Sequence, residues 1–226
     1  PASDGLSLIK AKARGADIRM VYSAADALKL AEQNPQREVV FFAIGFETTT
    51  PPTALVIRDA AARAVKNFSV LCCHVLTPAA ITHILEAAEA RLLGTVPIDG
   101  FIGPAHVSII IGSKPYEAFA QTYQKPVVIT GFEPLDVMQG ILMLVRQINA
   151  GRGVVENEFS RVVTRDGNQA AQALMAQIFD LRESFEWRGL GEVPYSALKI
   201  RPTFAEWDAE RKFDLHYASV PDHKQC

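Results

Sequence analysis

The strongest constraint on this chain is an alternation of short β-rich runs with stretches of helical length. Most of the runs are apolar on consecutive residues, which is typical of strands that are buried on both faces of a parallel sheet. The stretches between them are long enough for the crossovers that join parallel strands. We therefore expect an α/β fold with a doubly wound, Rossmann-like parallel sheet. The predicted strands are residues 17–22, 39–44, 68–73, 98–102 and 126–130, and the predicted helices are residues 6–14, 24–33, 53–65, 78–93 and 116–122.

The alternation lapses towards the end of the chain. An apolar helix is expected at residues 135–148, and Gly151-Arg152-Gly153 ends it. The sheet domain is therefore followed by a C-terminal helical and irregular segment. This segment is predicted to contain a strand within 154–163, a helix over 169–181 with Asn168 as its cap, an irregular stretch over 185–202 and a short helix over 204–213.

Composition and charge exclude several classes of protein. The chain has 23 basic and 25 acidic residues, so it lacks the positive surface that a nucleic-acid backbone requires. No apolar run approaches the roughly 20 residues that cross a bilayer, and no secretory leader is visible. Cys72, Cys73 and Cys226 do not form a disulfide framework, because two are neighbours and the third is the last residue. We expect a cytoplasmic protein with neither a nucleic-acid nor a membrane partner.

Common nucleotide and hydrolase motifs are absent from the sequence. No Gly-x-Gly-x-x-Gly follows a predicted strand, and no Gly-Lys-Thr or Gly-x-Ser-x-Gly occurs. Dinucleotide binding, nucleoside-triphosphate binding and a serine-hydrolase mechanism therefore have no support from motifs.

One tripeptide recurs at the ends of two predicted strands. Gly45-Phe46-Glu47 follows one apolar run, and Gly131-Phe132-Glu133 follows another. Ligands of open α/β sheets bind at the carboxyl ends of the strands, so we expect both turns on the same edge of the sheet and look for a site there. The candidate residues for a shared cleft are Glu47, Thr48, Thr49, His106 and Glu133.

Each candidate also has a structural explanation. Either Glu could stabilise a helix start through the helix dipole, by about 0.3 to 1 kcal/mol. One Thr before Pro51-Pro52 could cap a helix, and His106 could be a hydrogen-bonded structural residue. Two functional alternatives stay open from the residues alone. One is a stand-alone hydrolase or lyase that uses Glu47, Glu133 and His106 as acid and base, and the other is a domain that docks a partner.

Several longer motifs, in the same order, resemble those of the HypD family of [NiFe]-hydrogenase maturation proteins. The resemblance covers nearly the whole chain. The matching stretches are residues 7–17, 39–49, 131–136, 155–157, 161–163, 167–168, 186–191 and 208–210.

The resemblance implies a cytoplasmic maturation factor, a scaffold and redox participant in assembly of the Fe(CN)2CO centre of the hydrogenase. It implies a HypC-type chaperone and a HypE-type cyanide donor as partners, and iron and a [4Fe-4S] cluster in the full-length family. Cysteine thiolates suit this chemistry because soft sulfur binds iron. We expect no independent catalytic turnover from this chain.

The chain departs from the family pattern at its cysteines. The family's Cys-Gly-Gly-His and Gly-Pro-Gly-Cys-Pro-Val-Cys motifs have no counterpart, and Gly103-Pro104-Ala105-His106-Val107 has Ala where the family has Gly. We expect the central part of a longer protein that binds no iron or cluster by itself, with Cys226 as one possible residue of a truncated cluster segment. The expected segments are 1–34, the remainder of a first α/β domain; 35–150, a second α/β domain; 151–213, packed back on both; and 214–226, the start of the iron–sulfur segment.

Overall fold

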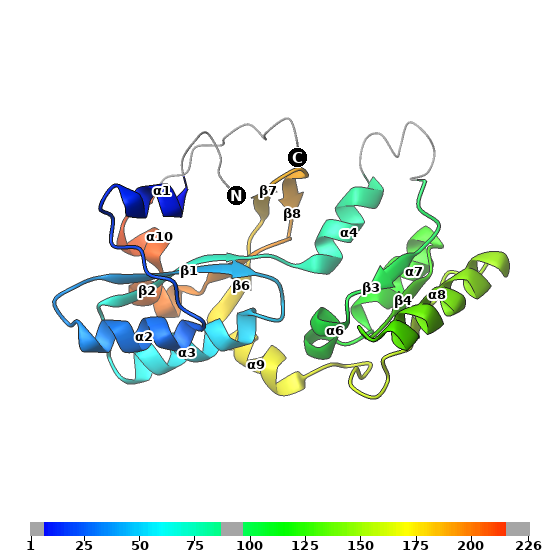
Figure 1. The fold of residues 1–226 in the computed structure, drawn as a ribbon, viewed down its shortest axis with the longest axis horizontal. Helices are drawn as coiled ribbons and strands as arrows, with labels where there is room; N and C mark the ends of the chain where they lie inside the picture. Colours follow the sequence, from blue (N-terminus) through cyan, green and yellow to red (C-terminus); the bar gives the residue numbers. More distant parts are fainter. Residues whose placement is uncertain (1–6, 87–96, 216–226) are drawn as a thin grey trace.

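The computed structural model describes residues 7–86 and 97–215. Two separate parallel sheets organise this part of the chain (Figure 1). Strands β1 (Val39–Gly45) and β2 (Phe68–His74) form the first sheet. Strand β4 (Val127–Ile129) lies between β3 (Phe101–Gly103) and β5 (Val155–Asn157) in the second sheet. The predicted α/β, Rossmann-like fold class is confirmed, but the expectation that the strands within residues 35–150 share one sheet is wrong, because β1 and β2 form one sheet and β3 and β4 belong to another.

Two helices cover one face of the first sheet. Helix α2 (Ala24–Gln33) begins at a capping box, in which Ser23 and Asp26 bond each other's backbone N–H. Helix α3 (Thr50–Ala62) begins with prolines at its first positions, where the missing N–H costs nothing. Their apolar sides and β1 and β2 share one core, which contains Leu28, Ile57 and Phe68.

The other face of β1 is open among the described residues. Val40, Phe42 and Ile44 are 45%, 46% and 62% exposed, whereas Ala43 is buried. Strand β1 therefore has the consecutive apolar residues of a doubly covered strand, but helices cover it on one face only.

The C-terminal segment returns to the first sheet. Helix α9 (Gln169–Ile178) packs on α3, and β6 (Phe179–Leu181) pairs with β9 (Leu198–Ile200) beside β2. The 3-10 helix η1 (Pro202–Trp207) and α10 (Ala209–Lys212) complete this side. In Figure 1 these yellow and orange segments lie next to the blue and cyan ones.

This return places the C-terminal segment beside the free edge of β2. Asp208 forms a bridge with Val70 of β2, and the Cys72 thiol contacts the Leu198 carbonyl at 3.4 Å. The C-terminal segment thus lies along the edge of β2, and β3 pairs with β4 in the second parallel sheet.

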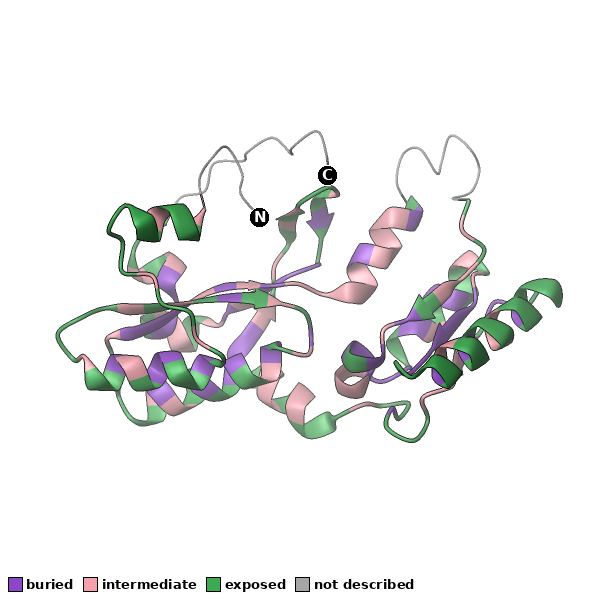
Figure 2. Cartoon of the chain, in the orientation of Figure 1, coloured by how far each residue is buried: buried purple, intermediate pink, exposed green. Residues whose placement is uncertain are grey.

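The second sheet has its own core and helices. Helices α6 (Ala105–Ile111), α7 (Pro115–Tyr123) and α8 (Pro134–Asn149) surround it, with Tyr116, Phe119 and Ile129 buried between them. Figure 2 shows α8 mainly in the colour of exposed residues. The remaining elements are α1 (Leu8–Ala13), α4 (Thr77–Glu86), β7 (Ser184–Trp187) and β8 (Gly191–Pro194).

Several regions differ from the sequence prediction. Residues 179–181, expected to end a helix, form strand β6, and the stretch expected to be irregular, 185–202, contains most of β7 and all of β8 and β9. Residues 17–22 form no strand and have no ladder with β1; Asp17 instead pairs with Arg19 at 2.9 Å. Residues 105–111 form a helix that the sequence does not predict, because the β-branched run at Ile109–Ile111 is typical of strands and packing overrides that preference. Within residues 7–86 and 97–215, no helix is long and apolar enough to cross a membrane.

Candidate functional site at the carboxyl ends of the strands

The first Gly-Phe-Glu turn depends on the conformation of Gly45. Its φ of 133° lies in a region that residues with a side chain rarely adopt, and an added Cβ would lie 2.3 Å from Thr49 Oγ1. The Gly45 carbonyl accepts from the Val75 N–H at 2.9 Å, which ties the turn to the end of β2. The glycine therefore lets the chain reverse closely enough to direct Glu47 inward.

Glu47 is buried and binds the start of the next helix. Its side chain is 1% exposed, and its carboxylate accepts from the Thr77 backbone N–H at 2.8 Å and from the Thr77 hydroxyl at 3.0 Å. Thr77 begins α4, so Glu47 satisfies one of the free amides of that helix. Burial raises the pKa of Glu47, and the bonds from Thr77 partly oppose that rise. Glu47 thus stabilises the start of a helix, as its structural explanation expects. That helix is α4, however, and not α3, which follows Glu47 in the chain.

His74 lies beside the same turn at the end of β2. Its Nε2 is 2.9 Å from Thr53 Oγ1, and its Nδ1 is 3.5 Å from Thr49 Oγ1. Burial lowers the pKa of His74 to about 4, so the ring is neutral near pH 7. The Thr50 hydroxyl donates to the Phe46 carbonyl at 3.0 Å. His74 and the threonines therefore hold the turn in place, and Thr48 is half-buried beside them.

The second Gly-Phe-Glu turn has a different environment. The Gly131 N–H donates to a Glu158 carboxylate oxygen at 3.2 Å, and an added Cβ at Gly131 would lie 1.9 Å from Asp136 Oδ2. Glu133 is exposed at the start of α8 and makes no side-chain capping bond. His106 is exposed as well, and its ring centroid lies 4.5 Å from that of Phe132.

A charged pair supports this second turn. Arg161 lies 2.5 Å from Asp136 and 4.4 Å above the ring of Phe159. The Arg161 guanidinium holds the pKa of Asp136 below its usual range. The site prediction omits Asp136, Glu158 and Arg161, although the motifs that carry the family resemblance contain the first and the last of them.

The structure groups the five candidate residues into two sets. Glu47, Thr48 and Thr49 follow β1, whereas His106 follows β3 and Glu133 follows β4. The expectation that both turns lie on one sheet edge is wrong, because β1 and β4 belong to different sheets.

The helices that follow these strands are linked across the molecule. Helix α9 packs against both α3 and α6, and the Gln172 side chain donates to the Ile110 carbonyl at 2.8 Å. Burial raises the pKa of Tyr116 on α7, and the Ser108 side chain partly opposes that rise. In Figure 1, α3 lies with α2 along one face of the first sheet, whereas α6 lies on the side of the second sheet that is nearer the first.

The described cysteines do not form an iron site. Cys72 is buried, and burial raises the pKa of its thiol to about 12, while Cys73 is half-buried and its pKa is also raised by burial. The Cys72 thiol donates instead to the Leu198 carbonyl at 3.4 Å, inside the core. Residues 7–86 and 97–215 contain no group of three His, Cys, Asp or Glu that could hold a metal ion. Cys226 lies outside the described residues.

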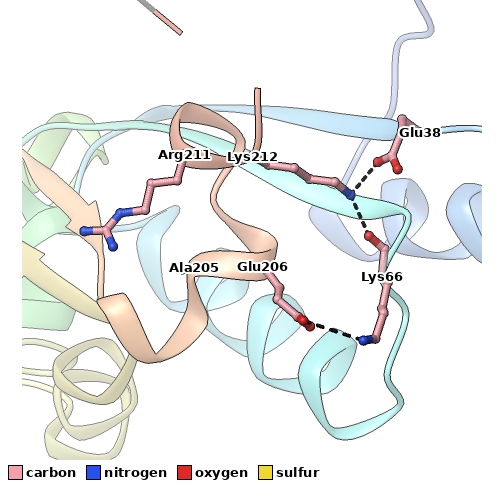
Figure 3. Close-up of a pocket in the computed structure, with 6 residues that line it drawn as sticks. All are labelled: Glu38, Lys66, Ala205, Glu206, Arg211 and Lys212. Atoms are coloured by element: carbon pink, nitrogen blue, oxygen red, sulfur yellow. Dashed lines mark hydrogen bonds and ion pairs between the residues drawn. The ribbon is translucent and has the colours of Figure 1, made fainter. Parts of the chain in front are cut away.

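A charged groove on the first sheet's outer side is already paired. Lys212 Nζ contacts Glu38 and the Lys66 carbonyl, both at 2.6 Å, and Lys66 lies 3.6 Å from Glu206 (Figure 3). Figure 3 shows Arg211 directed away from this cluster. These charges offset one another, so we prefer the strand ends as the candidate site.

The whole chain is similar to proteins of one family. A family model described as "HypD: Hydrogenase formation hypA family" matches residues 1–226. The hydrogenase maturation factor HypD of Cupriavidus necator is 74% identical over 226 residues, which are 100% of this chain and 60% of that protein. HypD of Rhizobium leguminosarum bv. viciae is 62% identical over 226 residues, which are 100% of the chain and 59% of that protein. HypD of Escherichia coli K12 is 45% identical over 213 residues, which are 94% of the chain and 55% of that protein. The chain therefore spans about three fifths of the length of the first of these relatives.

Proposed function

Because this chain belongs to the HypD family, we propose that it acts in hydrogenase maturation, as part of a factor that assembles the Fe(CN)2CO centre. The observation that carries the proposal is the match to the C. necator maturation factor, which is 74% identical over all 226 residues. Both Gly-Phe-Glu turns and the residues around them lie inside this match.

The strand-end residues are the proposed working part of this chain. Glu47 and the threonines of the first turn are held rigidly, while His106 and Glu133 of the second turn are exposed to a partner or to cargo. We propose that Glu133 and His106 contact the iron centre's ligands or the protein that delivers them, and that Glu47 maintains the loop between β2 and α4. Thr48 and Thr49 support the same loop.

The iron chemistry is assigned to the full-length protein. The described cysteines do not fit a cluster site, so a [4Fe-4S] cluster needs ligands from elsewhere in a longer chain. Such a cluster would supply electrons. Cys226 as one of its ligands stays a prediction.

The partners and the compartment are also proposals. A HypC-type chaperone would bring the iron centre, and a HypE-type protein would donate cyanide, in the cytoplasm. Two exposed aromatic residues, Phe46 at 46% and Phe132 at 65%, mark the turns at which a protein partner could bind.

A stand-alone hydrolase is not supported. That mechanism needs Glu47, Glu133 and His106 around one substrate, but Glu47 is buried against Thr77 while the other two residues are exposed beside a different sheet.

A chain exchange tests the proposed function. The matching 226 residues of the C. necator factor are replaced by this chain, and the chimera is expressed in a strain that lacks its own factor. We expect restored hydrogenase activity, with infrared bands of cyanide and carbonyl ligands in the purified hydrogenase. A chimera that accumulates to the level of the native factor, but leaves the hydrogenase without these bands, would contradict the proposal.

A further inference from the structure

The hairpin formed by β7 and β8 has no role in the proposed function so far. It contains the motif Glu186–Gly191, which belongs to the family resemblance. The hairpin lies beside the loop that joins β2 to α4, where Val75 forms a bridge with Ala197. This is the loop that Glu47 binds through Thr77.

A series of hydrogen bonds connects the hairpin to that loop. The Trp187 indole N–H donates to Ser196 Oγ at 2.7 Å, and the Ser196 hydroxyl donates to the Val193 carbonyl at 2.8 Å. The Ser196 carbonyl accepts from the Leu76 N–H at 2.7 Å. Ser196 is fully buried, and its hydroxyl uses its single proton and a lone pair in these contacts. Trp187 therefore holds the Ser196 side chain in place. The Ser196 carbonyl in turn holds the backbone of Leu76.

Leu76 directly precedes the residue that binds Glu47. The Thr77 N–H and hydroxyl donate to the Glu47 carboxylate at 2.8 and 3.0 Å. A shift of the Leu76 backbone would thus move both donors, since they belong to the next residue.

The same indole also contacts the turn on its other side. The Trp187 ring centroid lies 6.3 Å from that of Phe46, at an interplanar angle of 52°. Phe46 directly precedes Glu47. Trp187 therefore contacts the turn that carries Glu47, and through Ser196 and Leu76 it is also connected to the Thr77 donors that bind Glu47. His83 Nε2 lies 3.2 Å from the Leu190 carbonyl, which joins the hairpin's turn to the body of α4.

We infer that Trp187 is a positioning residue, which sets the geometry of Glu47 and the start of α4 through Ser196 and Leu76. This inference deepens the proposed function, because Glu47 belongs to the proposed site.

The test compares two tryptophan variants of the chain. Trp187→Phe keeps an aromatic ring beside Phe46 but removes the indole donor. Trp207→Phe is the matched control, because Trp207 also donates its indole N–H, to the Val65 carbonyl at 3.0 Å, away from the turn. We expect the Leu76 and Thr77 amides to exchange hydrogen about tenfold faster in Trp187→Phe and within about twofold of the parent rate in Trp207→Phe. The pH midpoint of the Thr77 amide shift, which reports the ionisation of Glu47, should move only in Trp187→Phe.

A third variant separates a local effect from general destabilisation. Ser196→Ala should reproduce the faster exchange, and the double variant should add little to it, because both changes break the same series of bonds. Unchanged exchange at Leu76 and Thr77 in Trp187→Phe, or equally faster exchange throughout β1 and β2, would overturn the inference. If the exchange and the midpoint change as expected but the Trp187→Phe chimera still matures hydrogenase fully, the positioning role stands and the proposed role of Glu47 fails.

Discussion

Gly45 and Glu47 have separate tasks within one turn. Gly45 provides a backbone conformation that other residues rarely adopt, and Glu47 uses the resulting close approach to bind the start of α4. At the second turn, Gly131 is surrounded instead by Asp136 and Phe159, and Glu133 points to solvent. The same tripeptide thus supports a buried acid at one place and an exposed acid at the other.

Gly45→Ala should destabilise the chain strongly. The added Cβ meets Thr49 Oγ1 at 2.3 Å, and the residue keeps a strained φ, so we expect a loss of about 2 to 4 kcal/mol in the free energy of unfolding. Urea unfolding followed by circular dichroism measures this loss. Gly151→Ala is the control, since its φ is also positive at 62° but nothing lies within 4 Å of the added atom; it should cost about 1 kcal/mol. Equal losses in the two variants would show that the contact with Thr49 is unimportant.

His74 should make the chain less stable in mild acid. Its pKa is about 4 in the folded chain and 6.5 in a model compound, so the unfolded chain binds a proton first as the pH falls. The stability that depends on neutral His74 is present above pH 6.5 and is lost towards pH 4, by up to about 3 kcal/mol. The difference in unfolding free energy between the parent and His74→Gln should therefore shrink between pH 7 and pH 4. A constant difference would contradict the buried, neutral histidine.

Glu47 should have the opposite pH dependence. Burial raises its pKa in the folded chain, so its contribution to stability is present below the model value of 4.5 and is lost as the pH rises through the raised value. Glu47→Gln removes this ionisation, because an amide stays neutral. The parent should therefore lose stability relative to Glu47→Gln as the pH rises from 4 towards 7, as measured by urea unfolding. A parent that gains stability relative to the variant over this range would show that the ionised form is preferred.

At the level of single elements, the sequence predicts a helix reliably where a capping residue and an apolar face indicate the same segment. The sequence predicts residues 24–33 as a helix, and α2 has these bounds with a capping box at Ser23. It also places β1 and β2 within one residue of their observed ends. Residues 17–22 have the composition of a strand but lack a paired neighbour, and pairing is a property of the fold rather than of the segment.

The site was only partly predictable for the same reason. The repeated tripeptide identified both turns, because each follows an apolar run. Assigning them to separate sheets required knowing that Asp208 and Leu198, far along the chain, lie beside β2. No local pattern contains that information.

The cap of α9 gives a prediction at this scale. The Ala171 N–H donates to the Asn168 side chain at 3.0 Å, so Asn168→Ala should cost about 1 kcal/mol of unfolding free energy. Asn168→Asp keeps the acceptor and should cost less than half as much. If the two variants are equally destabilised in urea, the capping bond is not what Asn168 contributes.

For the molecule as a whole, Arg182 joins distant segments. Its guanidinium donates to the Leu198 carbonyl at 3.0 Å, to the Cys72 carbonyl at 3.1 Å and to Glu210 at 2.5 Å. Strands β2 and β9 and helix α10 therefore meet at one side chain, on the β2 edge that separates the two sheets.

Arg182→Ala should weaken this junction severely. It leaves Glu210 largely buried without its Arg182 partner, so we expect a loss of about 3 to 5 kcal/mol. Arg211→Ala removes an exposed arginine 3.5 Å from Asp208 and should cost less than about 1 kcal/mol. Thermal unfolding of both variants measures the contrast, and a mild effect of Arg182→Ala would mean that the C-terminal segment is held by apolar packing alone.

The central claim is that the strand-end acids act in hydrogenase maturation, and Glu133→Gln tests it most directly because Glu133 is exposed and its loss should leave the fold intact. The variant is made in the C. necator chimera, beside Glu183→Gln, which changes an exposed glutamate that belongs to neither turn. At equal amounts of chimera, we predict that Glu133→Gln lowers hydrogenase activity about tenfold or more, equivalent to about 1.4 kcal/mol, while Glu183→Gln leaves it unchanged. Full activity with Glu133→Gln would contradict the claim.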